Sequence, residues 1–255
     1  MKDQTLLALF GDLTHPLVAP LATWGAASPR FATFVEEHRD KIRKKARGAR
    51  DPEALSDLLL ELAVARDLHR ERLGALAYEP HPPDRTRVPD FALTLPSGVI
   101  VIVEVTRMRP AVVVAGEGEV NAAPRRAGDS PPIDARLSVA LCGKLSQLVP
   151  GLPNVVVVGV PAESLPALDV AEAMRALVAR AERRELTPRE RHYIRKPGDF
   201  FKHYQRLSGL VVRPWPPPVP AQRATFWENK QATKTLPARL RLGLTESPDD
   251  QLVSA

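Results

Sequence analysis

Apolar residues recur with a helical period in the first third of the chain. Residues 28–48 carry an apolar side that runs from Phe31 to Ile42, and Ser28 followed by Pro29 is typical of a helix start. Residues 52–73 place leucines at positions 55, 58, 59 and 62, which is the spacing of one helix face. The pattern therefore predicts two amphipathic helices ahead of the first strands.

The central part of the chain changes to a pattern typical of strands. Short strands are expected over 75–79 and 90–95, and the run VIVIVEVT predicts a buried strand over 99–106. An amphipathic helix over 133–149 and the apolar run NVVVVGV at 154–160 follow. A strand, a helix and a strand in this order form a right-handed crossover, so the strands at 99–106 and 154–160 should be parallel. Further elements are expected as helices at 168–185 and 198–207 and as strands at 210–213 and 223–228.

These elements together predict an α/β fold with a mixed central sheet flanked by helices. Residues 1–50 are expected to form an N-terminal helical extension packed on the core, 51–213 the α/β core, and 214–255 a C-terminal strand and tail. Residues 110–132 show no clear periodicity. A loop of this length inside a compact domain is usually functional or disordered.

Two carboxylates mark the hairpin between 90 and 106. Glu104 stands in an almost unbroken apolar run, on the same strand face as Ile102 and Thr106. A carboxylate buried there costs roughly several kcal/mol unless it is paired or binds a metal. Asp90, after Pro89, opens the neighbouring strand. Two linked strands that each present a carboxylate indicate a site for a divalent cation.

Lys144 is the third residue of interest, because it falls on the apolar stripe of its helix. The stripe contains Leu137, Leu141 and Leu148, and Gln147 lies about one turn from Lys144 on the same side. One interpretation is a lysine that extends past the helix end toward water. The other is a charged lysine paired with buried carboxylates, which we favour because Glu104 also needs a partner.

Glu61 and Glu79 are weaker candidates. The helical neighbours of Glu61 are mostly apolar, so it lies at the edge of the core, where an ordinary ion pair with an arginine would explain it. Glu79 could line the same cleft, but a salt bridge to Arg85 or Arg87 is the preferred interpretation.

Composition narrows the classes of function. The net charge of +6, with 36 Lys and Arg against 30 Asp and Glu, favours polyanionic partners. The single cysteine, Cys142, excludes an intrachain disulfide, fits a reducing cytoplasm, and is expected to be an inert buried thiol. No apolar run is long enough to span a membrane, and no Gly-x-Ser-x-Gly motif or zinc-type histidine spacing occurs.

Two basic segments have alternative interpretations. The end of the 28–48 helix carries a run of Lys and Arg between Arg39 and Arg47, which could be a solvated face or an edge that contacts phosphates. Residues 191–206 mix basic and aromatic side chains, as single-strand binders do, but a packed helix with a charged outer side is slightly preferred.

The ordered set of these segments resembles the PD-(D/E)XK nuclease superfamily, whose members have a restriction-endonuclease-like fold. The segments are ELAVARDLHRERLGALAYEP, then VPDF, VIVIVEVT, KLSQL and NVVVVGV, and the resemblance covers about residues 50–160. Asp90 resembles the aspartate of the PD pair, Glu104 the acidic residue of the second half, and Glu61 the core-helix glutamate. The chain departs from the family at Thr106, where the lysine would stand.

The resemblance implies a metal-dependent nuclease. Asp90 and Glu104, with the Val105 carbonyl, would hold Mg²⁺ or Mn²⁺ through hard oxygen ligands, and Glu61 would hold a water molecule or a second ion. Some relatives place the lysine on the following helix, which suits Lys144 with Gln147 beside it. The implied partner is nucleic acid, with DNA favoured over RNA, and a homodimer is a further option.

The alternative belongs to a different class of protein. Thr106 at the lysine position could mean that catalysis has been lost. The fold would then be an inactive module that binds nucleic acid through its arginine-rich edges or docks a protein partner.

Overall fold

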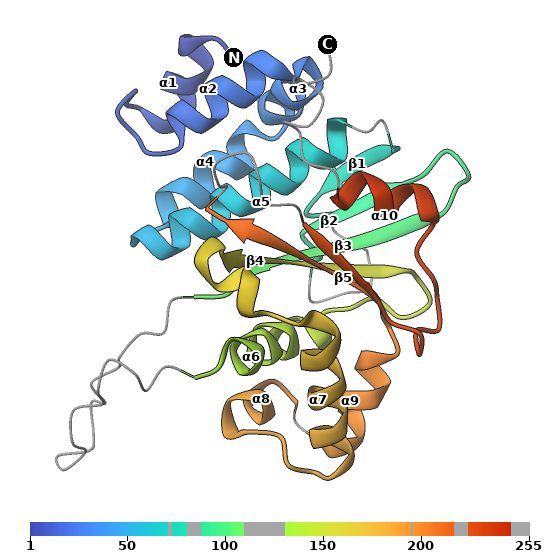
Figure 1. Cartoon of the computed structure of the whole chain (residues 1–255). Coiled ribbons are helices and arrows are strands. Elements are labelled where there is room, and N and C mark those ends of the chain that lie inside the picture. Colours follow the sequence, from blue (N-terminus) through green and yellow to red (C-terminus); the bar gives the residue numbers. More distant parts are fainter. Residues whose placement is uncertain (71–72, 81–87, 110–130, 195, 217–223, 246–255) are drawn as a thin grey trace, which may run out of the picture.

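A six-stranded sheet separates the helices of this protein into two layers (Figure 1). The computed structural model describes residues 1–70, 73–80, 88–109, 131–194, 196–216 and 224–245. The strands follow one another across the sheet in chain order. They are β1 (Ala75–Tyr78), β2 (Phe91–Thr94), β3 (Ile100–Arg107), β4 (Asn154–Pro161), β5 (Leu207–Trp215) and β6 (Thr225–Glu228).

The sheet is mixed, as the sequence predicts. β1, β2 and β3 are antiparallel neighbours, β3, β4 and β5 run parallel, and β6 returns antiparallel to β5. The parallel pairing of β3 and β4 confirms the expected crossover. β4 lies between two parallel partners and is buried along nearly its whole length, which explains its unbroken run of valines.

One face of the sheet carries the N-terminal helices. A core of buried residues joins these helices to the odd-numbered valines of β3, such as Val101 and Val103, and to Trp215 of β5. The N-terminal helices are α1 (Asp3–Phe10), α2 (Val18–Ala27), α3 (Pro29–Glu37), α4 (Arg39–Gly48) and α5 (Pro52–Arg70), and α10 (Ala238–Thr245) joins the same core from near the C-terminus. The residues 1–50 are thus helical and pack on α5, on the side of the sheet away from the crossover helix.

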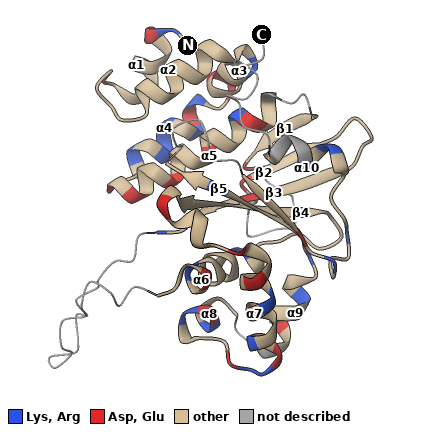
Figure 2. Cartoon of the chain, in the orientation of Figure 1, with Lys and Arg blue, Asp and Glu red and all other residues tan. Residues whose placement is uncertain are grey.

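The opposite face carries the crossover helix and its neighbours. A second core joins them to the even-numbered valines of β4, including Val156 and Val158. The elements are α6 (Ile133–Leu145), η1 (Ala162–Ala167), α7 (Val170–Glu182), α8 (Pro188–Tyr193) and α9 (Pro197–Tyr204). Charged residues gather on the helices of both layers, whereas the strands are mainly uncharged (Figure 2).

Several predicted elements have different bounds in the structure; the helix expected over 133–149, for example, ends at Leu145. The helix expected over 28–48 is divided at His38, whose φ of −106° and ψ of 15° end α3 and begin α4 in a new direction. His38 packs its ring on Phe34 and Tyr78 there. The strand expected over 210–213 is longer, since Ser208 accepts a hydrogen bond from the Asn154 N–H. Pairing with β4 therefore holds polar residues in β5 that the apolar pattern alone does not include.

Some of the expectations concern residues that the structure does not describe. Most of the loop expected over 110–132 is outside the described residues, as are Arg85 and Arg87, the proposed partners of Glu79. β5 continues through Trp215, past the position 213 at which the core was expected to end. None of the helices that the structure describes combines the length and the apolar character that a membrane span requires.

A substitution at Gly74 can test how closely the start of β1 approaches the end of β2. A Cβ at this position would lie 2.0 Å from the Thr94 carbonyl oxygen, so Gly74→Ala must push β1 away from β2. We expect this variant to lower the free energy of unfolding by about 1–3 kcal/mol in urea denaturation. Gly198→Ala is the control, because a Cβ added at this α9 position would contact no neighbouring group within 4 Å. It should change the free energy of unfolding by less than about 1 kcal/mol. Equal stability of the two variants would contradict the close packing.

Candidate active site

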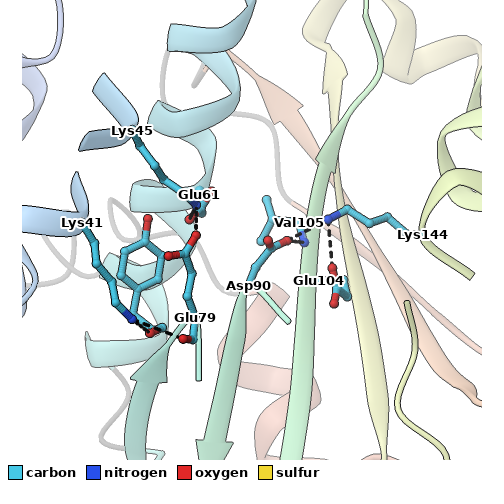
Figure 3. Close-up of polar contacts among 9 residues, drawn as sticks. Lys41, Lys45, Glu61, Glu79, Asp90, Glu104, Val105 and Lys144 are labelled. Carbon is cyan, nitrogen blue, oxygen red and sulfur yellow. Dashed lines mark hydrogen bonds and ion pairs between the residues drawn. The ribbon is translucent and has the colours of Figure 1, made fainter. Parts of the chain in front are cut away.

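Glu104 is the buried centre of the candidate site. It lies on β3, on the face that meets α6, and its side chain has no exposed surface. The Lys144 ammonium group reaches down from α6 and lies 2.9 Å from Glu104 Oε2 and 2.9 Å from Asp90 Oδ2 (Figure 3). The predicted proximity of this lysine to both carboxylates is therefore confirmed. The alternative, a lysine extended toward water, is wrong, because its side chain is only 15% exposed.

Asp90 completes the hairpin at the point where β2 begins. Its Oδ2 atom accepts a hydrogen bond of 2.7 Å from the Val105 N–H, in the place of a backbone carbonyl from β2. The register pairs Phe91 with Val103, and its continuation would put Pro89 opposite Val105. Proline has no N–H to donate to the Val105 carbonyl, which points to the same side of β3 as the Val105 N–H. The Pro-Asp pair thus leaves two carboxylates and one carbonyl close together.

The protonation of these groups follows from burial. Loss of water and the neighbouring charge of Asp90 raise the pKa of Glu104 from 4.5 to about 7, against the opposing effect of Lys144. Burial alone would lower the pKa of Lys144, but Asp90 and Glu104 outweigh it and raise that pKa above its ordinary value. Lys144 is therefore a permanent cation at neutral pH, while Glu104 is poised between its two forms.

A second lysine-centred cluster lies on the other side of Asp90. Lys45 of α4 places its Nζ 2.6 Å from Glu61 Oε1 and 2.6 Å from Glu79 Oε1. Burial and the charge of Asp90 raise the pKa of Glu61, although Lys45 opposes this. Figure 3 shows Asp90 between this cluster and Lys144. Glu61 thus lies within electrostatic reach of Asp90, but its ion pair is with Lys45.

The basic run of α4 is explained in part by this cluster. Lys41 donates hydrogen bonds to the backbone carbonyls of Tyr78 and Glu79, and Lys45 lies 5.1 Å from the centre of the Tyr78 ring. Figure 2 places the basic residues of α4 beside α5. These two lysines hold α4 on the end of β1, so they form neither a simple solvated face nor an edge free to contact phosphates.

The remaining sequence candidates surround Lys144. Gln147 folds back to donate a hydrogen bond to the Gly143 carbonyl, 3.1 Å away, and lines a groove of about 930 Å³ together with Thr106. Gln147 thus lies next to Lys144 rather than on the carboxylates. Cys142 is fully buried, and burial raises the pKa of its thiol to about 12, as expected for an inert cysteine.

The fit of a divalent cation can be judged from the oxygen atoms. Within the described residues, no group of three or more His, Cys, Asp and Glu side chains is arranged to hold a metal ion. Glu104 Oε1, however, is buried without a hydrogen-bond partner in the part of the chain that the structure describes. The carboxylates of Asp90 and Glu104, the latter with this unsatisfied oxygen, and the Val105 carbonyl are oxygen ligands of the kind that a magnesium-type ion takes. Glu61 is not part of this oxygen set.

Two features of the site were not singled out from the sequence. Lys45 belongs to a basic run in which the i, i+4 spacing with Lys41 singles out one helix face, and this signal could have identified it. The groove wall α8 was also missed, although Thr187-Pro-Arg-Glu190 is a capping-box signature for a helix start.

Glu104 should make stability depend on pH in an unusual direction. Because its pKa is raised in the folded state, the folded protein binds more protons than the unfolded chain between about pH 4.5 and 7. The contribution of Glu104 to the free energy of unfolding should therefore fall as pH rises through this window, by at most about 3 kcal/mol. Urea denaturation in EDTA should show this contribution as the difference between the wild type and Glu104→Gln, because both proteins keep the shifted pKa values of Glu61 and the partly buried histidines.

The control for this experiment is Glu172→Gln, which changes a carboxylate that is 63% exposed on α7. Its pH profile should follow that of the wild type. Parallel profiles for Glu104→Gln and the wild type would show that Glu104 is ionised with an ordinary pKa.

No family model, no curated protein and no solved structure matches the chain. The geometry around Lys144, Asp90 and Glu104 is therefore the observation that bears on function.

Proposed function

We propose that this protein is a metal-dependent nuclease that hydrolyses phosphodiester bonds in nucleic acid. The observation that carries the proposal is the Lys144 ammonium group, 2.9 Å from both Asp90 and Glu104 at a hairpin that opens with Pro-Asp. A buried cation shared by two carboxylates is a costly arrangement for stability alone, because hydrophobic residues of similar volume often serve as well. Such arrangements concentrate at functional sites.

The restriction-endonuclease-like core is part of the same proposal. It is supported by the antiparallel strands β1 to β3, the crossover through α6, and the parallel strand β4. In this arrangement Asp90 and Glu104 come from adjacent strands, and the lysine comes from the helix that follows, in place of Thr106. The choice of DNA over RNA and the formation of a homodimer stay predictions.

The residues of the chain would act on the phosphate as follows. Asp90, Glu104 and the Val105 carbonyl would hold Mg²⁺ or Mn²⁺, which supplies a Lewis acid and lowers the pKa of water. Lys144 places a fixed positive charge where negative charge develops on the phosphate oxygens in the transition state.

A second candidate function is favoured by one observation. Both carboxylates already have a cation partner in Lys144, and no three-residue metal cluster occurs in the described ranges. This charge balance suits an inactive nuclease-like module, which would bind nucleic acid through its arginines without cutting it.

A cleavage assay separates the two functions. Labelled single-stranded and duplex DNA and RNA are incubated with the protein in Mg²⁺, Mn²⁺, Ca²⁺ or EDTA, and products are resolved by electrophoresis. We expect cleavage in Mg²⁺ or Mn²⁺ and none in EDTA. Asp90→Asn and Glu104→Gln should lower the rate by roughly 100-fold or more, since each removes a charged oxygen ligand. Binding without cleavage under every condition would establish the inactive module.

Lys144 provides an independent test of its catalytic role. Lys144→Met keeps most of the length of the side chain and removes its charge, so we expect the cleavage rate to fall by roughly 100- to 1000-fold. Lys230→Met, at a side chain that is 83% exposed, is the control and should cut like the wild type. Circular dichroism should show that both variants fold. Unchanged cleavage by folded Lys144→Met would remove this lysine from the mechanism.

A further inference from the structure

A cationic groove adjoins the candidate active site. It lies between the end of β3, the exposed side of α6, and α8, and it has a volume of about 930 Å³. No acidic side chain among the described residues lines it. Lys144 lines the groove, so the groove and the carboxylate site share this residue. The cationic side chains of the lining are Arg107, Arg109, Arg136, Lys144 and Arg189.

These arginines differ in their availability to a ligand. Arg107 is held by Glu53 and Asp57 and is only 7% exposed, so its charge is already balanced. Arg136 donates to the Arg109 carbonyl, and no acidic side chain in the described ranges pairs with Arg136 or Arg189. Arg136 and Arg189 therefore present unbalanced positive charge from two walls of the groove, α6 and α8.

Tyr193 adds an aromatic surface to the same groove. Its side chain is 42% exposed, which is unusual for a large aromatic residue in this protein. A Cβ on Gly143 would lie 3.7 Å from the Tyr193 ring, an ordinary contact distance, so the ring lies against α6 next to Lys144.

Buried polar contacts tie α8, which carries Arg189 and Tyr193, to the rest of the fold. Glu190, a fully buried carboxylate, accepts hydrogen bonds from Arg180 at 2.6 Å and from the Thr187 N–H at 2.7 Å. The Thr187 hydroxyl completes the capping box by accepting from the Glu190 N–H. This network ties the short helix to α7, so the groove wall is part of the rigid fold.

We propose that this groove binds a single, unpaired nucleic-acid strand, with Tyr193 stacked on a base and Arg136 and Arg189 on phosphates. Base stacking on an aromatic ring requires an exposed base face, which a duplex does not offer along its length. Arginine side chains beside such a ring can bind the phosphates of the strand whose base stacks on the ring. Lys144 lines the groove and also belongs to the carboxylate site, so a strand bound here would lie next to Asp90 and Glu104. The inference rests on the proposed nuclease function and names its substrate.

Binding in EDTA tests the proposal without any need for cleavage. Fluorescence anisotropy is measured on the full chain with a labelled single-stranded DNA, the same sequence as RNA, and the DNA duplex. We expect the single strands to bind more tightly than the duplex. Comparison of the DNA strand with the RNA strand shows which of the two the groove prefers. Tyr193→Ala should weaken single-strand binding by roughly 5- to 100-fold and leave duplex binding nearly unchanged, while Tyr193→Phe retains the wild-type affinity.

The phosphate contact of Arg189 is tested through the salt dependence of single-strand binding. Arg189→Ala should weaken binding and reduce the slope of log K against log salt by roughly 0.7, the value for one phosphate contact on a single strand. Arg191→Ala is the matched control, since Arg191 is exposed on the same helix and outside the groove. It should change the slope by less than Arg189→Ala does.

The outcomes distinguish this inference from the proposed function. Wild-type affinity of Tyr193→Ala and Arg189→Ala for single strands, or no binding by the wild type, would overturn the groove as a nucleic-acid site. Cleavage in Mg²⁺ or Mn²⁺ by these same variants would still leave the nuclease function in place. Single-strand binding that depends on Tyr193, without cleavage in any metal, would keep the groove and overturn catalysis.

Discussion

The contact on which the rest of the site depends is the buried ion pair between Lys144 and the two carboxylates. β3 is a central strand, and its apolar residues bury Glu104 whether or not the carboxylate has a partner. Removing one partner of a buried pair typically costs about 3–5 kcal/mol, so Lys144 makes the position of Glu104 tolerable. The same contact adds an ionic link between α6 and β3 to the apolar packing of Leu137 and Leu141 on the sheet. Lys144 also lines the groove between α6 and α8.

Asp90 connects the two faces of the sheet. Through Val105 and Lys144 it belongs to the α6 side, and its charge also raises the pKa of Glu61 on α5. A change at Asp90 therefore affects the strand pairing and both lysine-centred clusters together. This coupling comes from one short side chain placed where β2 begins and the ladder hydrogen bonds to β3 end.

The local pattern predicted those parts of the fold and site that depend on one periodicity. Glu104 stands out because it interrupts a strand of valines, and Lys144 because it occupies an apolar stripe, so both were found. The break at His38 was missed, because it depends on the packing of that ring against Phe34 and Tyr78, which come together only in the fold. Lys45 was found only as part of a basic run, since its partners Glu61 and Glu79 are distant in the sequence.

The ion pair also determines when, during synthesis of the chain, all the groups of the candidate site are present. Lys144 follows Glu104 by 40 residues and Asp90 by 54, so the cation is synthesised long after the carboxylates that it balances. A chain that has folded only its first hairpin holds two carboxylates that repel each other and lacks the lysine and the groove. Docking of α6 brings the cation to the carboxylates, and the strands β4 to β6, which follow in the chain, complete the sheet. If the protein cuts nucleic acid, a growing chain that ends before Lys144 therefore lacks the cation that the proposed mechanism uses.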